Sequence, residues 1–66
     1  MTPTEIIEAL RLARLSRRMT QDQLAESLGT TPQSIGKWER GINFPNFETL
    51  ARWADALGHS LSIAPN

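Results

Sequence analysis

Apolar residues recur at intervals of three and four along most of the chain, the spacing that places them on one face of an α-helix. Four such stripes are present, and residues that start or stop helices stand at their ends. The pattern predicts helices from Pro3 to about Arg17, from Gln21 to Gly29, from Pro32 to Gly41 and from Phe47 to Leu57. We therefore expect an all-α fold of four helices in a single domain over residues 1–66.

Each predicted helix has an apolar face that is expected to form the core. The core positions are Ile6, Ile7, Leu10 and Ala13; Leu24, Ala25 and Leu28; Ile35 and Trp38; and Phe47, Leu50, Ala51, Ala54 and Leu57. Trp53 lies at the edge of the last stripe, and Leu12 and Leu15 lie opposite the first one. Isolated exposed leucines are ordinary on protein surfaces. The alternative for these two is contact with the C-terminal tail or with a second subunit.

The densest helix signals lie in residues 20–41, TQDQLAESLGTTPQSIGKWERG. Thr20 and Gln23 have the spacing of a capping box, in which each side chain accepts a hydrogen bond from the other residue's backbone N–H. Gly29 suits the left-handed position that ends a helix. Thr31 and Pro32 suit the N-cap and the first position of the next helix. The stretch therefore predicts two short helices joined by a tight turn.

The helix that follows this turn divides its side chains between two opposed faces. Ile35, Trp38 and Glu39 face one way. The other face carries Gln33, Lys37 and Arg40, with the bare backbone of Gly36 beside them. A helix that is buried on one side and offers amide, ammonium and guanidinium donors on the other suits a DNA major groove. A solvated polar face is the alternative interpretation of the same pattern.

Residues 20–41 resemble the helix-turn-helix of phage repressors and Cro proteins. The resemblance is carried by TQxxLAxxLG followed by TxxSIxxWERG, and it extends from about Leu10 to Gly58. It implies a compact repressor-like domain that binds double-stranded operator DNA sequence-specifically and represses transcription. In this family an arginine at the position of Arg14 pairs with the glutamate of the WERG stretch, here Glu39. Such a pair would tie the first helix to the third.

The expected DNA contacts divide between residues that read bases and residues that hold the backbone. We expect Gln33 to read adenine N6 and N7 and Lys37 to read guanine O6 and N7, with Ser34 as a third base-reading candidate. The residues expected to hold phosphates or set the register are Thr20, Gln21, Thr31, Arg40 and Asn43. Pro32 replaces a side-chain amide that other members of the family use, so we expect a narrower base readout.

Residues 59–64 alternate between polar and apolar and predict a short β-strand ahead of Pro65. A single strand needs a partner, so we expect two chains to pair there as a homodimer. Their reading helices would then lie about 34 Å apart on a pseudo-palindromic site. The candidate interface residues are Trp53, Leu57, Leu61 and Ile63. The alternative function is a protein-interaction module, such as an antitoxin that neutralises a toxin, with or without autoregulatory DNA binding.

Composition narrows the remaining classes of function. Seven basic and seven acidic residues cancel, but Arg11, Arg14, Arg17 and Arg18 crowd the end of the first helix. The chain has no cysteine and one histidine, His59, so we expect neither a disulfide nor a metal site. Catalytic groups and a phosphate-cradling glycine loop cannot be assembled, so we expect no enzyme activity and no cofactor. Apolar runs fall short of a membrane span, and we expect a cytoplasmic protein without membrane contact.

Overall fold

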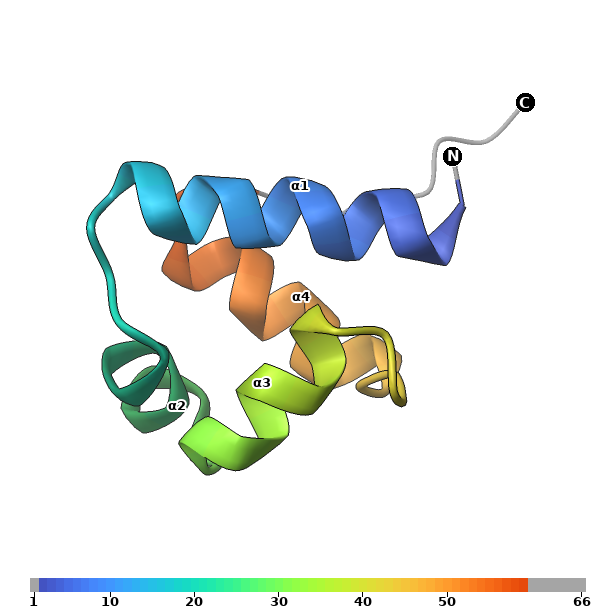
Figure 1. Ribbon diagram of the computed structural model, residues 1–66. Coiled ribbons are helices and arrows are strands. Elements are labelled where there is room, and N and C mark those ends of the chain that lie inside the picture. Colours follow the sequence, from blue (N-terminus) through green and yellow to red (C-terminus); the bar gives the residue numbers. More distant parts are fainter. Residues whose placement is uncertain (1, 60–66) are drawn as a thin grey trace.

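The computed structural model describes residues 2–59, and all regular secondary structure in that range is helical (Figure 1). The helices are α1 (Pro3–Ser16), α2 (Gln21–Leu28), α3 (Pro32–Glu39) and α4 (Phe47–Ala56). The prediction of four helices is confirmed, with ends within one or two residues of those expected. The strand predicted for residues 59–64 lies outside the described residues, apart from His59. Within residues 2–59, no helix is long and apolar enough to cross a bilayer.

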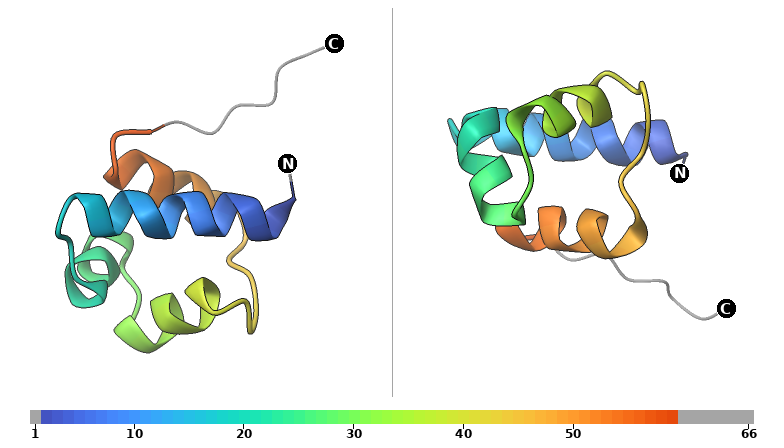
Figure 2. Two further views of the ribbon diagram at one scale, coloured as in Figure 1. Left: turned by 45° about the horizontal axis from the view of Figure 1, so that its top comes forward. Right: turned by 90° about the horizontal axis from the view of Figure 1, so that it is seen from below.

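The four helices surround one core. In Figure 1, α1 runs along the top of the molecule, α2 and α3 meet at a sharp angle below it, and α4 lies behind. The right-hand view of Figure 2 shows α3 and α4 on opposite sides, with α2 at one end between them. α2 packs against both α3 and α4, and α1 packs against α3. This arrangement leaves one side of α3 open.

The helix starts are fixed by four N-cap side chains, Thr2, Thr20, Thr31 and Asn46. The first two caps form reciprocal capping boxes. Thr2 exchanges hydrogen bonds of 3.1 Å with Glu5, and Thr20 exchanges bonds of 3.0 and 2.8 Å with Gln23. Each cap satisfies backbone N–H groups that the helix itself cannot, and contributes about 1 kcal/mol. The N-caps predicted at Thr20 and Thr31 are therefore confirmed.

The core is built from the apolar faces of all four helices. Its buried apolar residues are Ile7, Leu10, Leu24, Ala25, Leu28, Ile35, Trp53, Ala54 and Leu57. Ile6, Ala13 and Trp38 pack against this set and remain partly exposed. The core faces predicted for α1, α2 and α3 are confirmed. Fully burying one leucine or isoleucine stabilises the fold by about 1.5–3 kcal/mol, so these faces hold the helices together.

The core face predicted for α4 is wrong at two positions. The sequence pattern places Phe47 in the core, but Phe47 is 60% exposed, whereas Trp53 is fully buried. Trp53 packs against Trp38 of α3, with ring centroids 6.2 Å apart and ring planes inclined by 37°. The pattern of α4 alone does not contain this tertiary contact. Trp53 and Leu57 have no exposed surface, so both are core residues of the single chain, and their part in a dimer interface stays a prediction.

Candidate nucleic-acid interface

The turn between α2 and α3 sets the direction of the helix that is expected to meet DNA. Gly29 has φ 68° and ψ 34°, the left-handed conformation predicted for it. Thr30 N–H donates to the carbonyl of Ala25 over 3.0 Å, and α3 begins two residues later at Pro32. So short a connection leaves α3 little freedom relative to α2. The two helices therefore behave as one unit.

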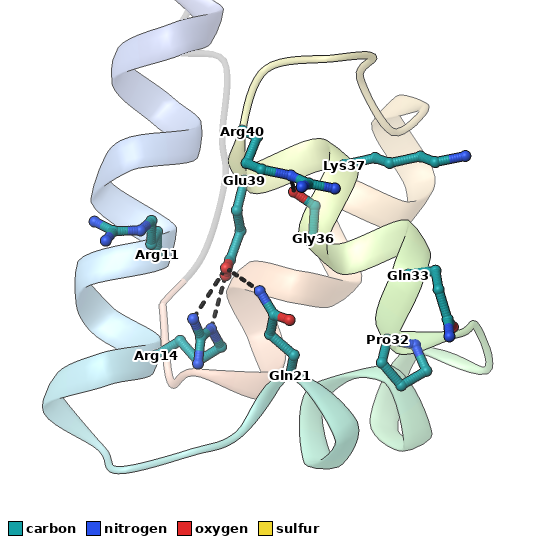
Figure 3. A pocket seen from close by; sticks show the side chains of 9 residues that line it. All are labelled: Arg11, Arg14, Gln21, Pro32, Gln33, Gly36, Lys37, Glu39 and Arg40. Carbon is teal, nitrogen blue, oxygen red and sulfur yellow. Dashed lines mark hydrogen bonds and ion pairs between the residues drawn. The ribbon is translucent and has the colours of Figure 1, made fainter.

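A buried ion pair fixes α3 to α1 (Figure 3). Arg14 Nε donates to Glu39 Oε2 over 2.7 Å, and Arg14 Nη2 donates to Glu39 Oε1 over 2.9 Å. The two side chains are only 9% and 4% exposed. Arg14 Nη1 also donates to the carbonyl of Met19 over 2.8 Å, so one guanidinium holds the turn between α1 and α2 as well. The structure thus contains the pair that the family resemblance implies.

Gln21 joins this pair from the start of α2. Its Nε2 donates to Glu39 Oε1 over 3.0 Å, so the amide that we expected at a phosphate is also part of the helix packing. We refer to Arg14, Gln21 and Glu39 as the hub, because each comes from a different helix. A side-chain amide has two N–H groups, and Glu39 takes one of them. A phosphate contact from the other N–H stays a prediction.

An open cleft of about 570 Å³ lies beside the hub, between α1 and the polar side of α3 (Figure 3). The residues that line it are Arg11, Arg14, Gln21, Pro32, Gln33, Gly36, Lys37, Glu39 and Arg40. Because Arg14 and Glu39 neutralise each other, the remaining charged residues of the lining are all basic, and the cleft has a net positive charge. Among residues 2–59, no cluster of three His, Asp or Glu side chains could hold a metal ion.

The predicted base-reading face of α3 borders this cleft. Gln33, Lys37 and Arg40 are all exposed. Figure 3 shows Gln33 and Lys37 extending away from the hub. Arg40 instead folds back along its own helix, where its Nε donates to the carbonyl of Gly36 over 3.1 Å. The face therefore presents two extended donors and one guanidinium held close to the helix backbone.

The remaining predicted DNA contacts lie at helix starts, apart from Asn43. Thr20 and Thr31 are the N-caps of α2 and α3. The Thr31 hydroxyl donates to Ser34 Oγ over 3.1 Å and accepts from Ser34 N–H over 3.2 Å. Asn43 lies exposed in the loop after α3. The N-terminal ends of α2 and α3 carry partial positive charge from their helix dipoles, and phosphate contacts there stay a prediction.

Five lining residues were not among the DNA contacts expected from the sequence: the paired Arg14 and Glu39, together with Arg11, Pro32 and Gly36. Arg11 precedes Arg14 by three positions, so both side chains lie on one side of α1. The sequence alone shows that Arg11 and Arg14 share one side of the helix, but it does not show that α1 lies against α3. The structure places the bare backbone of Gly36 in the cleft wall.

Sequence comparisons relate the chain to helix-turn-helix proteins. Residues 10–63 match the sequence profile of the helix-turn-helix family. Multiprotein-bridging factor 1a of Arabidopsis thaliana is 39% identical over 59 residues, which cover 89% of this chain and 42% of that protein. The HTH-type transcriptional activator BcrR of Enterococcus faecalis is 44% identical over 46 residues, 70% of this chain and 22% of that protein.

A third relative comes from a prophage. The SPbeta prophage-derived uncharacterized HTH-type transcriptional regulator YonR of Bacillus subtilis is 38% identical over 53 residues, 80% of this chain and 49% of that protein. The chain thus spans less than half the length of each of these three relatives. No solved structure matches it significantly.

Proposed function

The chain belongs to the helix-turn-helix family, and we propose that it regulates transcription by binding operator DNA sequence-specifically through α3. The observation that carries this proposal is the exposed donor face of α3. The helix itself is held in place against α1 by the buried Arg14–Glu39 pair. A helix supported from one side and offering hydrogen-bond donors on the other suits the major groove. Repression needs only that the bound domain occupies the operator, so we propose a repressor.

The proposed contacts follow the positions of the side chains. Gln33 and Lys37 extend from α3 and read base edges, with Ser34 beside them near the helix start. The residues proposed to hold the backbone are Thr20, Gln21, Thr31, Arg40 and Asn43. Because phosphates occur at every base pair, this second group sets register and affinity, and the first group sets the preferred sequence.

Lys37→Ala and Arg40→Ala are expected to affect DNA binding in different ways, although each removes one exposed cation from the same helix face. Losing Lys37 should cost about 1–3 kcal/mol on the preferred site and relax the preference at one base position. Losing Arg40 should weaken binding to all sequences alike and lower the salt slope by about one. Titration of both variants on the preferred duplex and on single-base variants tests this, and the reverse pattern would contradict the assignment.

Selection from random duplexes, followed by a salt titration, tests the proposed function. We expect a preferred site to emerge and the logarithm of the binding constant to fall steeply with the logarithm of salt concentration, by about 0.9 per phosphate contacted. A chain that shows no preferred site and no salt slope is not a DNA-binding regulator. A separate titration of the selected duplex at a concentration well above Kd gives the number of chains bound per site.

A homodimer on a pseudo-palindromic site is part of the proposal. One reading helix with three or four base-reaching side chains discriminates poorly, and two linked half-sites multiply the preference. The interface candidates Leu61 and Ile63 lie outside the described residues, and Trp53 and Leu57 belong to the core. Two chains per selected site, with half-sites about 34 Å apart, are expected. One chain bound to an asymmetric site would contradict the dimer.

A second candidate function is a protein-interaction module, including an antitoxin that binds a toxin. The observation that favours it is a set of large apolar side chains that are half exposed or nearly so, Leu12, Leu15, Ile42, Phe44 and Phe47. The multiprotein-bridging relative also carries a protein-binding role in its name. A pure adaptor would give no salt-dependent binding to duplex DNA, so the titration above separates the two functions.

A further inference from the structure

The cleft between α1 and α3 carries positive charge that is not neutralised within the hub. Arg14 and Glu39 neutralise each other, and Glu39 is the sole acidic residue in the lining. Arg11, Lys37 and Arg40 remain as cations around a concave surface. Positive side chains gathered around a hollow raise the local concentration of anions. The cleft is therefore suited to a negatively charged group.

Gly36 forms part of the cleft surface, and the fold does not require a glycine there. Gly36 lies inside α3, and it is not among the residues with positive φ in the described chain. A Cβ at this position would lie 3.8 Å from both Gln21 Oε1 and Arg40 Nη2, which is ordinary van der Waals contact. Glycine weakens a helix interior relative to alanine. Neither the packing nor the backbone conformation of the folded chain therefore explains a glycine at this position.

Hydrogen-bond donors border the cleft beside Gly36, together with one acceptor, Gln21 Oε1. The Arg40 guanidinium is anchored through Nε to the Gly36 carbonyl, which leaves both Nη groups able to bind a ligand. Gln21 has a second amide N–H beyond the one used in the hub. Arg11 pairs with Glu8 over 3.1 Å, and the two side chains are 40% and 54% exposed. Such exposed pairs contribute little and are screened by salt, so Arg11 can exchange Glu8 for another anion.

We propose that this cleft binds one phosphodiester of the DNA backbone, with Arg11 of α1 and Arg40 of α3 as its cationic partners and Gly36 as its open surface. The site rests on the proposed DNA-binding function and adds α1 to the elements that contact DNA. A phosphate is the same group at every base pair. The contact therefore raises affinity for all duplexes and positions α3 without selecting a sequence.

Arg11→Gln tests whether the cation on α1 contacts the phosphodiester. Arg52→Gln is the matched control, because Arg52 is exposed on α4 and does not line the cleft. For Arg11→Gln we expect a salt slope lower by about one and a Kd raised several-fold on both the preferred and random duplexes. Arg52→Gln should keep the slope and the Kd of the unaltered chain. An Arg11→Gln slope equal to that of the control, or a loss confined to one base position, would overturn the site.

Gly36→Leu tests the open surface, because leucine fills the cleft while favouring the helix. Its Tm should be at least that of the unaltered chain, and its Kd should rise about tenfold or more on every duplex. Unchanged binding by Gly36→Leu would overturn the site while leaving the proposed function intact. If the unaltered chain itself shows no salt slope on duplex DNA, the site and the proposed function are both wrong.

Discussion

Arg14→Ala is expected to lower the free energy of unfolding by about 3–5 kcal/mol, because it leaves the Glu39 carboxylate buried without its cation. Glu39 is 4% exposed, and Gln21 Nε2 would remain as its hydrogen-bond donor within residues 2–59. A domain of 66 residues has a total stability of roughly 3–10 kcal/mol. The variant should therefore be largely unfolded or marginally folded, as measured by thermal and urea melts.

Arg11→Ala is the matched control for this loss, because it removes the same side chain from the same helix. The Arg11–Glu8 pair is exposed on both sides, so its loss should cost at most about 1 kcal/mol. The double variant Arg14→Ala with Glu39→Ala should be less destabilised than the sum of the two single changes, since no carboxylate is then stranded. If Arg14→Ala melts together with Arg11→Ala, the hub is no more than a surface contact.

Local hydrogen bonds explain why the helix starts could be predicted. The two partners of each capping box are three positions apart, Thr2 with Glu5 and Thr20 with Gln23, so both lie within one short stretch of sequence. The left-handed residue at Gly29 is a local signal of the same kind. These features need no knowledge of what packs against the helix.

The candidate site could be predicted only in part, because it combines one local feature with several tertiary ones. The donor face of α3 follows from helical spacing alone, and Lys37 extends from it as expected. Gln21 reaches Glu39 because of the angle at which α2 meets α3. Arg11 reaches the cleft because α1 packs against α3. Neither relation can be predicted from periodicity within a single helix.

The buried face of α4 shows the same limit. Its apolar residues allow a face that includes Phe47 or a face that includes Trp53, because both sets share Leu50, Ala54 and Leu57 at helical spacing. The contact of Trp53 with Trp38 decides between them. Phe47 is the first residue of the helix and remains at the surface.

Trp53→Ala should therefore destabilise the protein much more than Phe47→Ala, although the sequence pattern places Phe47 in the core and Trp53 at its edge. Trp53 is fully buried, so its truncation should cost about 3–5 kcal/mol through lost burial and the cavity left behind. Phe47 is 60% exposed, and its truncation should change stability by about 0.5 kcal/mol or less. Urea melts of both variants measure the two losses, and sedimentation reports the number of subunits. A Trp53→Ala chain that melts like the unaltered protein but sediments at half its mass would return Trp53 to a subunit interface.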